Sequence, residues 1–270
     1  MPKTILLTGA TDGIGLETAK MLAPLGHRLL LHGRSAAKLR QVEQEVASLP
    51  GAGTVETFEA DFSDMRQVAA FASAIAEGHG ALDVLINNAG VFMAPPQLTP
   101  DGLDIRFAVN TIAPFLLTTR LSPRMGRGGR VINLSSAAQS KVNLEVLAGR
   151  QGPLPDNQAY AQSKLAITMW SAGLAKLYED DGPVVVAVNP GSLLGSKMVR
   201  EAYGMAGGDL KKGAEILTRA ALSEEFAHAN GRYFDNDSGR FASPHADALN
   251  HDKNQIVIDT ITTFLKETLR

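Results

Sequence analysis

The chain has 270 residues, and 26 Lys and Arg against 28 Asp and Glu give it a formal net charge of -2 at pH 7. This balance excludes the basic excess expected of a nucleic-acid-binding protein, and a hydrophobic content of 44% excludes a disordered chain. The absence of Cys excludes disulfides, thiolate metal sites and a cysteine nucleophile. The length favours one α/β domain, residues 1–270, over two domains.

No segment reaches the roughly 18 uninterrupted apolar residues that would cross a bilayer. The N-terminus enters an expected strand after three residues and does not present a signal peptide. We therefore expect a cytoplasmic protein with no membrane partner.

Short apolar runs alternate with segments of helical spacing along the first part of the chain. The runs predict strands and the spaced segments predict helices, in the order 4–8, 14–25, 28–32, 36–49, 54–60, 65–77 and 82–87. This alternation implies right-handed crossovers and a parallel sheet covered by helices, which is a doubly wound α/β architecture.

The second part of the chain continues the pattern with longer helices. Helices are predicted over 102–121, 159–177 and 255–269, and strands over 130–134 and 184–188. The strand at 184–188 is a continuous β-branched run, which suits a strand buried on both faces.

A glycine-rich turn, Thr8-Gly9-Ala10-Thr11-Asp12-Gly13-Ile14-Gly15, lies where the first strand feeds the first helix. A doubly wound sheet binds a dinucleotide at this position, because the helix N-terminus offers free N–H groups to a phosphate. Gly9 would permit the sharp turn, Gly13 the close approach of the backbone to a phosphate, and Gly15 the packing of helix on strand. A purely structural turn is the alternative.

Tyr160 and Lys164 stand four residues apart in a predicted helix, so the phenol and the ammonium share one face. Such pairs usually lie on solvated helix faces. The pair therefore indicates chemistry only when other motifs support it.

Three motifs in order supply that support. Thr8-Gly9-xxx-Gly13-Ile14-Gly15, Asn87-Asn88-Ala89-Gly90 and Tyr160-xxx-Lys164 together resemble the short-chain dehydrogenase/reductase family, and the resemblance covers essentially the whole chain. It implies a Rossmann fold with a single seven-stranded, mostly parallel sheet, helices on both faces and a nicotinamide cofactor.

The resemblance also implies which nicotinamide cofactor is bound. An acidic residue at the end of the second strand would bind the ribose 2'-hydroxyl of NAD, but Arg34 stands there and suits the 2'-phosphate of NADP. NADP(H) is therefore preferred, with NAD(H) as the alternative. The implied cofactor-binding residues are Gly9, Thr11, Asp12, Gly13, Ile14, Gly15, Arg34, Asp61, Phe62, Asn88, Ala89, Gly90, Tyr160, Lys164, Pro190 and Gly191.

The implied catalytic residues are Asn110, Ser136, Tyr160 and Lys164. Ser136, the second of two serines after a strand, would donate to the substrate carbonyl oxygen, with Ser135 as a bystander. A free Tyr has a pKa of about 10, and the Lys164 ammonium would favour its anion, so that Tyr160 acts as general acid and base. No metal is required.

Asn110 lies inside a predicted helix, where its intrinsic propensity is poor. The resemblance implies that it marks a backbone kink and that a bound water links it to Lys164.

A long segment, 139–157, separates Ser136 from Tyr160 and contains several Gly and Pro residues, so we expect it to loop over the mouth of the cleft. This segment, called the insert below, resembles the retinol dehydrogenase-like branch of the family. Gly231-Arg232-Tyr233-Phe234 and Ala242-Ser243-Pro244 support the same resemblance. A substrate lid is expected at about residues 192–215, and its candidate apolar pocket residues are Met198, Val199, Tyr203 and Met205.

These residues predict an NADP-dependent oxidoreductase that moves hydride between the nicotinamide and a carbonyl or alcohol carbon of an apolar small molecule. The alternative is a non-catalytic NADP-binding sensor or regulatory protein of the same fold, which would need only the glycine turn and Arg34. A sugar-nucleotide epimerase would need a larger C-terminal domain than the residues after Gly195 provide. The family resemblance also implies a homo-oligomer, either a dimer or a tetramer.

Overall fold

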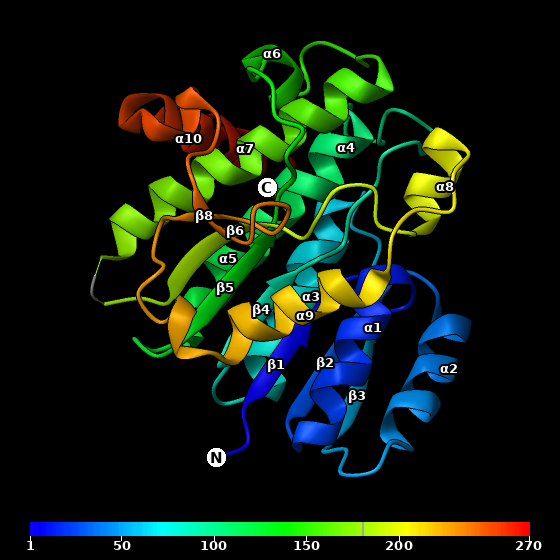
Figure 1. Ribbon diagram of the computed structural model, residues 1–270. Coiled ribbons are helices and arrows are strands. Elements are labelled where there is room, and N and C mark those ends of the chain that lie inside the picture. Colours follow the sequence, from blue (N-terminus) through cyan, green and yellow to red (C-terminus); the bar gives the residue numbers. More distant parts are fainter. Residues whose placement is uncertain (180) are drawn as a thin grey trace.

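The computed structural model describes residues 1–179 and 181–270, without the side chains of Ala202 and Tyr203. Tyr203, one of the expected pocket residues, therefore has a side chain outside the described part. A single sheet lies between two layers of helices (Figure 1). The strand order is β3-β2-β1-β4-β5-β6-β7-β8, and every neighbouring pair is parallel except β7 and β8.

The strands are β1 (Thr4–Leu7), β2 (Arg28–Gly33), β3 (Val55–Glu59), β4 (Val84–Asn87), β5 (Arg130–Leu134), β6 (Val184–Asn189), β7 (Tyr233–Asp235) and β8 (Arg240–Ala242). The predicted doubly wound fold is confirmed, with one strand more than predicted. The sequence patterns predict ranges for six of these strands, and the two strands outside those ranges are β7 and β8, an antiparallel pair of three residues each. A strand of this length is too short to show a hydrophobic period in the sequence.

The α-helices are α1 (Gly13–Leu22), α2 (Ala36–Ala47), α3 (Met65–Gly78), α4 (Ile105–Phe107), α5 (Ala113–Leu121), α6 (Leu144–Leu147), α7 (Asp156–Tyr178), α8 (Lys197–Tyr203), α9 (Leu210–Leu222) and α10 (His251–Thr268). A π-helical turn, η2 (Ala108–Ile112), joins α4 to α5. Short 3-10 turns cover Ala23–Leu25, Ser122–Arg124, Glu224–Phe226 and Ala246–Leu249.

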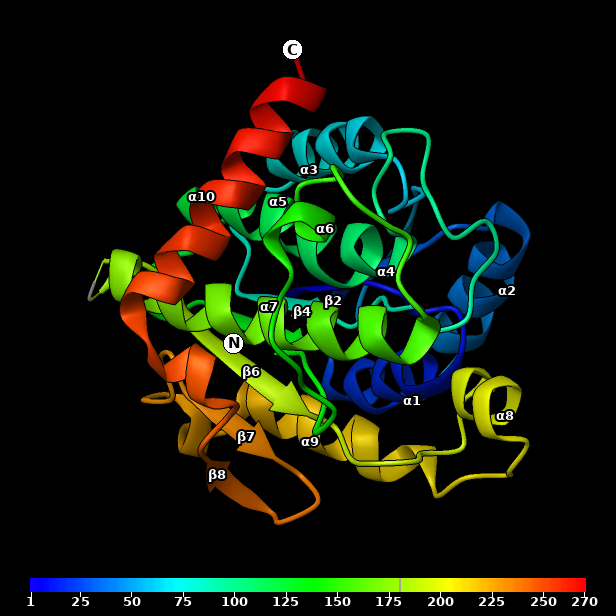
Figure 2. The ribbon, with the colours of Figure 1, turned by 90° about the horizontal axis from the view of Figure 1, so that it is seen from above.

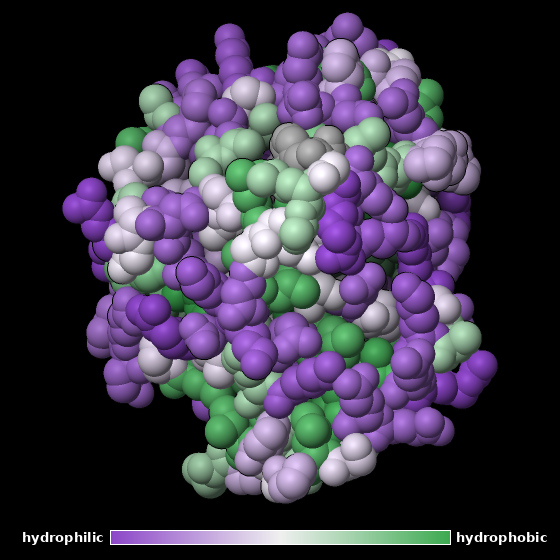
Figure 3. Space-filling view, turned by 45° about the vertical axis from the view of Figure 1, so that its right-hand side comes forward, coloured by the Kyte–Doolittle hydropathy of each residue, from purple (hydrophilic) through white to green (hydrophobic). Residues whose placement is uncertain are grey.

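Two cores fill the space on either side of the sheet because successive strand residues point to opposite faces. On β1, Leu6 belongs to the core under α3, α5, α7 and α10, whereas Ile5 and Leu7 belong to the core under α1, α2 and α9. Seen from above, α3, α5 and α10 lie on one side of the strands, and α1 and α9 lie on the other (Figure 2). Polar and charged residues cover much of the outer face seen in Figure 3, with apolar patches between them.

The helix predicted over 102–121 is interrupted. Asp104 caps its start by accepting from the backbone N–H of Arg106 (3.0 Å), and the π-helical turn follows directly after α4. Pro114 explains part of this irregularity, because it has no N–H to donate to the carbonyl of Asn110 as a regular α-helix would require. The kink expected at Asn110 is therefore present as a π-helical turn.

The first βα turn is held by steric contacts that allow no side chain at Gly15. Gly9 has a φ of 66°, in the left-handed region. A Cβ on Gly15 would lie 2.1 Å from the carbonyl oxygen of Gly9 and 2.5 Å from Nδ2 of Asn88. Helix α1 can therefore approach the end of β1 only with glycine at position 15.

We predict that Gly15→Ala lowers the free energy of unfolding by about 1–3 kcal/mol, because the added methyl group forces the helix away from the turn. Gly78→Ala is the control, since a Cβ there meets nothing within 4 Å and the change should be neutral or stabilise by up to ~1 kcal/mol. Urea unfolding of both variants measures the difference. Equal stabilities for the two variants would contradict the close packing at Gly15.

Candidate active site

A cleft of about 650 Å³ lies at the carboxyl ends of the central strands. The expected cofactor residues that line it are Gly9, Thr11, Asp12, Gly13, Ile14, Gly15, Arg34, Asp61, Phe62, Asn88, Ala89, Gly90, Tyr160, Lys164 and Pro190. Gly191, Asn110 and Ser136 are not among its lining residues. The structure thus brings together nearly all of the residues that the motifs singled out, although they come from six separate segments.

Asn88 links the end of β4 to the glycine turn through hydrogen bonds. Its Nδ2 donates to the carbonyl oxygens of Thr8 (2.9 Å) and Gly9 (3.0 Å). The hydroxyl oxygen of Thr8 accepts from the backbone N–H groups of Asn88 and Ala89 (both 3.0 Å). These contacts fix the turn from the side of the neighbouring strand, so Asn88 has a structural function at the edge of the cleft.

Asn87 points into the sheet and starts a buried chain of amide contacts. Its Nδ2 donates to Oδ1 of Asn133 (2.8 Å), and Nδ2 of Asn133 donates to Oγ of Ser171 (2.8 Å). The chain joins β4 to β5 and β5 to α7, which carries Tyr160 and Lys164.

His32 is a residue of the cleft that the sequence reasoning missed. It is buried, its ring stacks on Phe62 with centroids 3.9 Å apart, and its Nδ1 lies 3.3 Å from the backbone N–H of Gly9. Its Nε2 lies 3.0 Å from the carbonyl oxygen of Ala60. Burial lowers the pKa of His32 to about 4, so at neutral pH the ring is uncharged, and the two contacts assign the proton to Nε2. Its position at the end of a buried apolar strand was the available signal.

Two cations line the cleft beside the end of β2, which β1 and β4 separate from β5, the strand on which α7 with Tyr160 packs. Arg34 follows the end of β2, and Lys38 lies in the first turn of α2; both side chains are exposed. Ser35 caps α2 by accepting from the backbone N–H of Lys38 (3.5 Å). Lys38 was missed in the sequence, although a cation one helical turn after Arg34 was a readable signal.

Lys164 is buried on the face of α7 that also carries Tyr160. Its Nζ donates to the carbonyl oxygen of Leu134 (2.7 Å) and lies 5.7 Å from the centre of the Tyr160 ring. Burial lowers the pKa of Lys164 to about 8. The half-buried Tyr160 ring meets the edge of Phe92, with centroids 4.9 Å apart.

The two serines after β5 have different surroundings. Ser135 is buried, and its hydroxyl contacts Oγ1 of Thr168 (2.6 Å) and the carbonyl oxygen of Lys164 (3.1 Å). Ser136 is half-buried, and its hydroxyl oxygen accepts only from the backbone N–H of Ala138 (3.1 Å) among the contacts of the described residues. Among the described residues, the Ser136 hydroxyl donates to no acceptor, whereas the Ser135 hydroxyl, which belongs to a residue lining the cleft, donates to the carbonyl oxygen of Lys164.

The side chain of Asn110 makes hydrogen bonds to other residues of the protein. Its Oδ1 accepts from the backbone N–H of Val91 (2.8 Å), and its Nδ2 donates to the Val91 carbonyl oxygen (2.9 Å) and to Oγ of Ser163 (3.0 Å). Gly90 lies between Asn110 and Lys164, because a Cβ on it would be 3.4 Å from Asn110 Oδ1 and 3.8 Å from Lys164 Nζ. The two residues are thus neighbours without touching directly.

The turn after β6 is held by the β7–β8 hairpin. Asn189 donates to carboxylate oxygens of Asp235 (2.8 Å) and Asp237 (2.9 Å), and Asp237 also accepts from the backbone N–H of Ser192 (2.8 Å). These contacts fix the start of the expected lid. From Leu210 on, the expected lid residues belong to α9, which packs on α1, so the segment beside the cleft is 192–209.

The insert takes a different place from the one expected. It contains α6, packs beside α10 and supplies no residue to the lining of the cleft. Its Asn143 donates its backbone N–H to Oε1 of Gln162 (2.9 Å), and its end forms the start of α7. Helix α7 begins at Asp156, three residues earlier than predicted.

Within the described residues, no helix combines the length and the apolar character needed to cross a membrane.

A parallel sheet with a glycine turn after β1 and a Tyr-xxx-Lys face beside β5 defines a class of nicotinamide-dependent oxidoreductases. The sequence model described as short chain dehydrogenase matches residues 3–206. The chain therefore belongs to the short-chain dehydrogenase family, whose members are oxidoreductases acting on alcohol or carbonyl groups.

Relatives of known name or structure agree with this assignment. Retinol dehydrogenase 12 of Mus musculus is 33% identical over 257 residues, which cover 90% of this chain and 81% of that protein. An uncharacterised protein from Mycobacterium Paratuberculosis has a similar structure, with a TM-score of 0.81, 27% identity and coverage of 98% of this chain and 96% of that one. A short chain dehydrogenase from Burkholderia cenocepacia in complex with NADP has a TM-score of 0.68 and 29% identity, with coverage of 86% and 95%. The expected resemblance to the retinol dehydrogenase-like branch is confirmed.

Because Lys164 is buried, we predict that the free energy of unfolding of the cofactor-free protein depends on pH. Because burial lowers the pKa of Lys164 from 10.5 to about 8, the unfolded chain binds more protons than the folded chain between these pH values. Stability attributable to this site therefore rises with pH in that window and is constant below it. The free energy of unfolding of the wild type should rise relative to Lys164→Met by on the order of 3 kcal/mol across the window. Urea unfolding of both proteins from pH 7 to pH 10 measures it, and a constant difference would contradict the burial of this ammonium.

Proposed function

We propose that the protein is an NADP(H)-dependent oxidoreductase that transfers hydride between the cofactor and a carbonyl or alcohol carbon of an apolar small molecule. The observation that carries the proposal is that one cleft is lined both by Arg34 and Lys38, beside the end of β2, and by Tyr160 and Lys164 of α7. Helix α7 packs on β5 and β6, and β1 and β4 lie between β2 and β5, so the two groups stand beside different strands. A dinucleotide would extend from one group to the other, whereas the substrate needs only the group at Tyr160.

The residues present fit NADP(H). The backbone of the glycine turn and the N-terminus of α1 face the cleft and would hold the diphosphate. Arg34 and Lys38 would pair with the 2'-phosphate, and Asp61 and Phe62 would flank the adenine. Lys164 would hold the nicotinamide ribose, beside Pro190 and Gly191. The structural relative in complex with NADP supports this choice.

The chemistry follows from where charge develops. When bound, the cofactor would supply a hydride to the substrate carbonyl carbon, and the electron pair of the C=O bond would move to the oxygen as negative charge. Ser136 donates a hydrogen bond to that oxygen, and Tyr160 gives it a proton to complete the alcohol. Lys164, as an ammonium, would stabilise the tyrosinate that remains, and a water bound between Asn110 and Lys164 would return a proton to Tyr160. Oxidation of an alcohol reverses each step.

The surroundings of Tyr160 favour an apolar substrate. The apolar residues Val91, Phe92, Met93, Val109, Leu134 and Met198 line the same cleft as Tyr160, and Met93 has 49% of its surface exposed. Large apolar side chains exposed beside a cleft indicate a surface that a ligand covers. The relative named as a retinol dehydrogenase supports this substrate class. A cytoplasmic location and a homodimer or homotetramer stay predictions.

We predict that Tyr160→Phe lowers kcat/KM for carbonyl reduction about 100-fold or more, because a positioned general acid contributes at least that factor. NADPH binding should change little. The measurement is NADPH absorbance with a panel of aldehydes and ketones that includes retinal.

Tyr178→Phe is the matched control. Tyr178 also lies on α7, but its hydroxyl accepts from Ser122 (3.0 Å), away from the cleft. Unchanged turnover in Tyr160→Phe would refute the mechanism. A wild-type protein that binds NADPH but turns over no member of the panel would instead support the sensor alternative.

We predict that Arg34→Ala weakens NADPH binding about tenfold or more and leaves NADH binding unchanged, because only NADPH carries the phosphate that the guanidinium would contact. Arg40→Ala is the control. Arg40 is an exposed residue of α2, six positions after Arg34, and it does not line the cleft. Fluorescence titration with both cofactors measures the effect. Equal weakening of both cofactors would count against a 2'-phosphate contact.

A further inference from the structure

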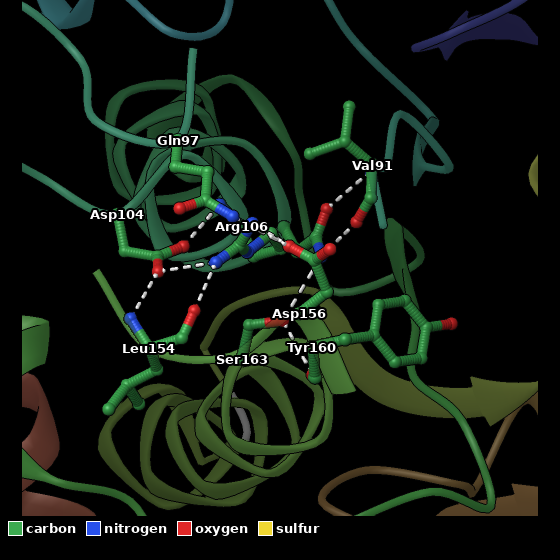
Figure 4. A network of polar contacts seen from close by, with 9 residues as sticks. Val91, Gln97, Asp104, Arg106, Leu154, Asp156, Tyr160 and Ser163 are labelled. Atoms are coloured by element: carbon green, nitrogen blue, oxygen red, sulfur yellow. Dashed lines mark hydrogen bonds and ion pairs between the residues drawn. The ribbon is translucent and has the colours of Figure 1, made fainter. Parts of the chain in front are cut away.

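Two polar ties join α7 to the segment that runs from α4 through η2, and Tyr160 lies between them. Figure 4 shows Arg106 directed at Asp104, Leu154 and Asp156, with Tyr160 and Ser163 further along α7. The first tie is formed by Arg106 and Asp156, and the second by Asn110 and Ser163.

The first tie is a buried guanidinium shared by two carboxylates. Arg106 is 0% exposed, and its Nη1 donates to Oδ1 of Asp156 at 2.7 Å. Its Nη2 donates to Oδ2 of Asp104 (2.7 Å) and to the carbonyl oxygen of Leu154 (2.9 Å). The planar fork of Arg matches this set of acceptors, whereas the single ammonium of Lys would not reach all of them.

The second tie lies about one helical turn further along the α4–η2 segment and about two turns further along α7. Asn110 donates to Oγ of Ser163 (3.0 Å), and the hydroxyl of Thr111 donates to the carbonyl oxygen of Ser163 (2.9 Å). Oγ of Ser163 in turn donates to the carbonyl oxygen of Tyr160 (2.7 Å).

The same residues hold the loop that packs on Tyr160. Asn110 makes two hydrogen bonds to Val91, the neighbour of Phe92. Nε2 of Gln97, further along this loop, donates to Oδ1 of Asp156 (3.3 Å). A shift of the start of α7 would therefore also move the loop that supplies Phe92.

The residues of α7 that take part in these contacts lie on the same face of the helix as Tyr160. Asp156, Tyr160 and Ser163 stand at positions i, i+4 and i+7 of α7, and Arg106 and Asn110 stand four residues apart on the facing segment. Residues at these separations lie on one side of a helix. The first turns of α7, which carry the phenol, are thus held before and after Tyr160.

We propose that Arg106 and Asp156 are positioning residues for the reaction assigned to Tyr160, acting through the first turn of α7. The inference rests on the proposed function of Tyr160. It also gives the insert a role, because the insert brings Leu154 and Asp156 within reach of Arg106. The insert is then a support of the catalytic helix and not a cover of the cleft.

The experiment is Asp156→Ala, which leaves Arg106 paired with Asp104 and Leu154, so that no buried charge is left without a partner. We expect kcat to fall about tenfold, because a small displacement of a catalytic group is sufficient for such a loss, while KM for NADPH is unchanged. Asp156→Asn keeps an oxygen that accepts from Arg106 and should restore kcat to within about threefold of the wild type.

Hydrogen exchange supplies a readout that does not depend on turnover. Backbone amides of residues 157–163 should exchange faster in Asp156→Ala than in the wild type, whereas those of residues 165–178 should not change. Glu145→Ala is the matched control, because it removes an exposed ion pair with Arg150 inside the same insert. It should alter neither kcat nor the exchange of 157–163.

The inference is wrong if Asp156→Ala keeps the wild-type kcat, or if Glu145→Ala lowers kcat as much. It is also wrong if exchange in residues 157–163 is unchanged. A wild-type protein without turnover overturns the proposed function of Tyr160, and the exchange result still decides whether Asp156 holds the first turns of α7.

Discussion

The site depends on one constraint, which is that a parallel sheet covered by helices on both faces has only its strand ends open to polar groups. Leu6, Leu85 and Val131 fill one face of three adjacent strands, and Ile5, Val84 and Ile132 fill the other. The polar residues that follow these strands therefore gather at one edge. Thr8, Asn88 and Ser135 stand side by side there because their strands are neighbours, although 127 positions separate the first from the last.

Several polar side chains at this edge make hydrogen bonds to other parts of the chain, among them those of Asn88, Asn133 and Ser135. Asn88 and Ser135 also line the cleft. Lys164 also does both, since its Nζ donates to Leu134 while it lines the cleft beside Tyr160. The burial that lowers its pKa also fixes its position, because the ammonium has little room other than against the β5 carbonyl.

The helix that carries Tyr160 is positioned at both ends of its catalytic region. The sheet holds α7 through Ser171, and the α4–η2 segment holds it through Asp156 and Ser163. The π-helical turn belongs to this arrangement, because it places Asn110 where its amide reaches both Val91 and Ser163. A buried ion pair adds little net stability by itself. We therefore assign to Arg106 the function of fixing the relative positions of the groups that accept its hydrogen bonds.

The sequence by itself determined the fold class, the glycine turn and the Tyr160–Lys164 face, because hydrophobic period and glycine spacing are local properties of the chain. Through the family resemblance it also indicated the break at Asn110, whereas the preference for Ser136 over Ser135 stays a prediction. It did not reveal Arg106 as a partner of Asp156, or His32 as a partner of Gly9, because those contacts join residues far apart in sequence. The sequence shows Arg106 between Ile105 and Phe107 but reveals neither its burial nor its partners. Only the tertiary structure decided that the insert lies against α4, α7 and α10 and not over the cleft, since the docking of a Gly- and Pro-rich segment depends on which distant side chains meet its backbone.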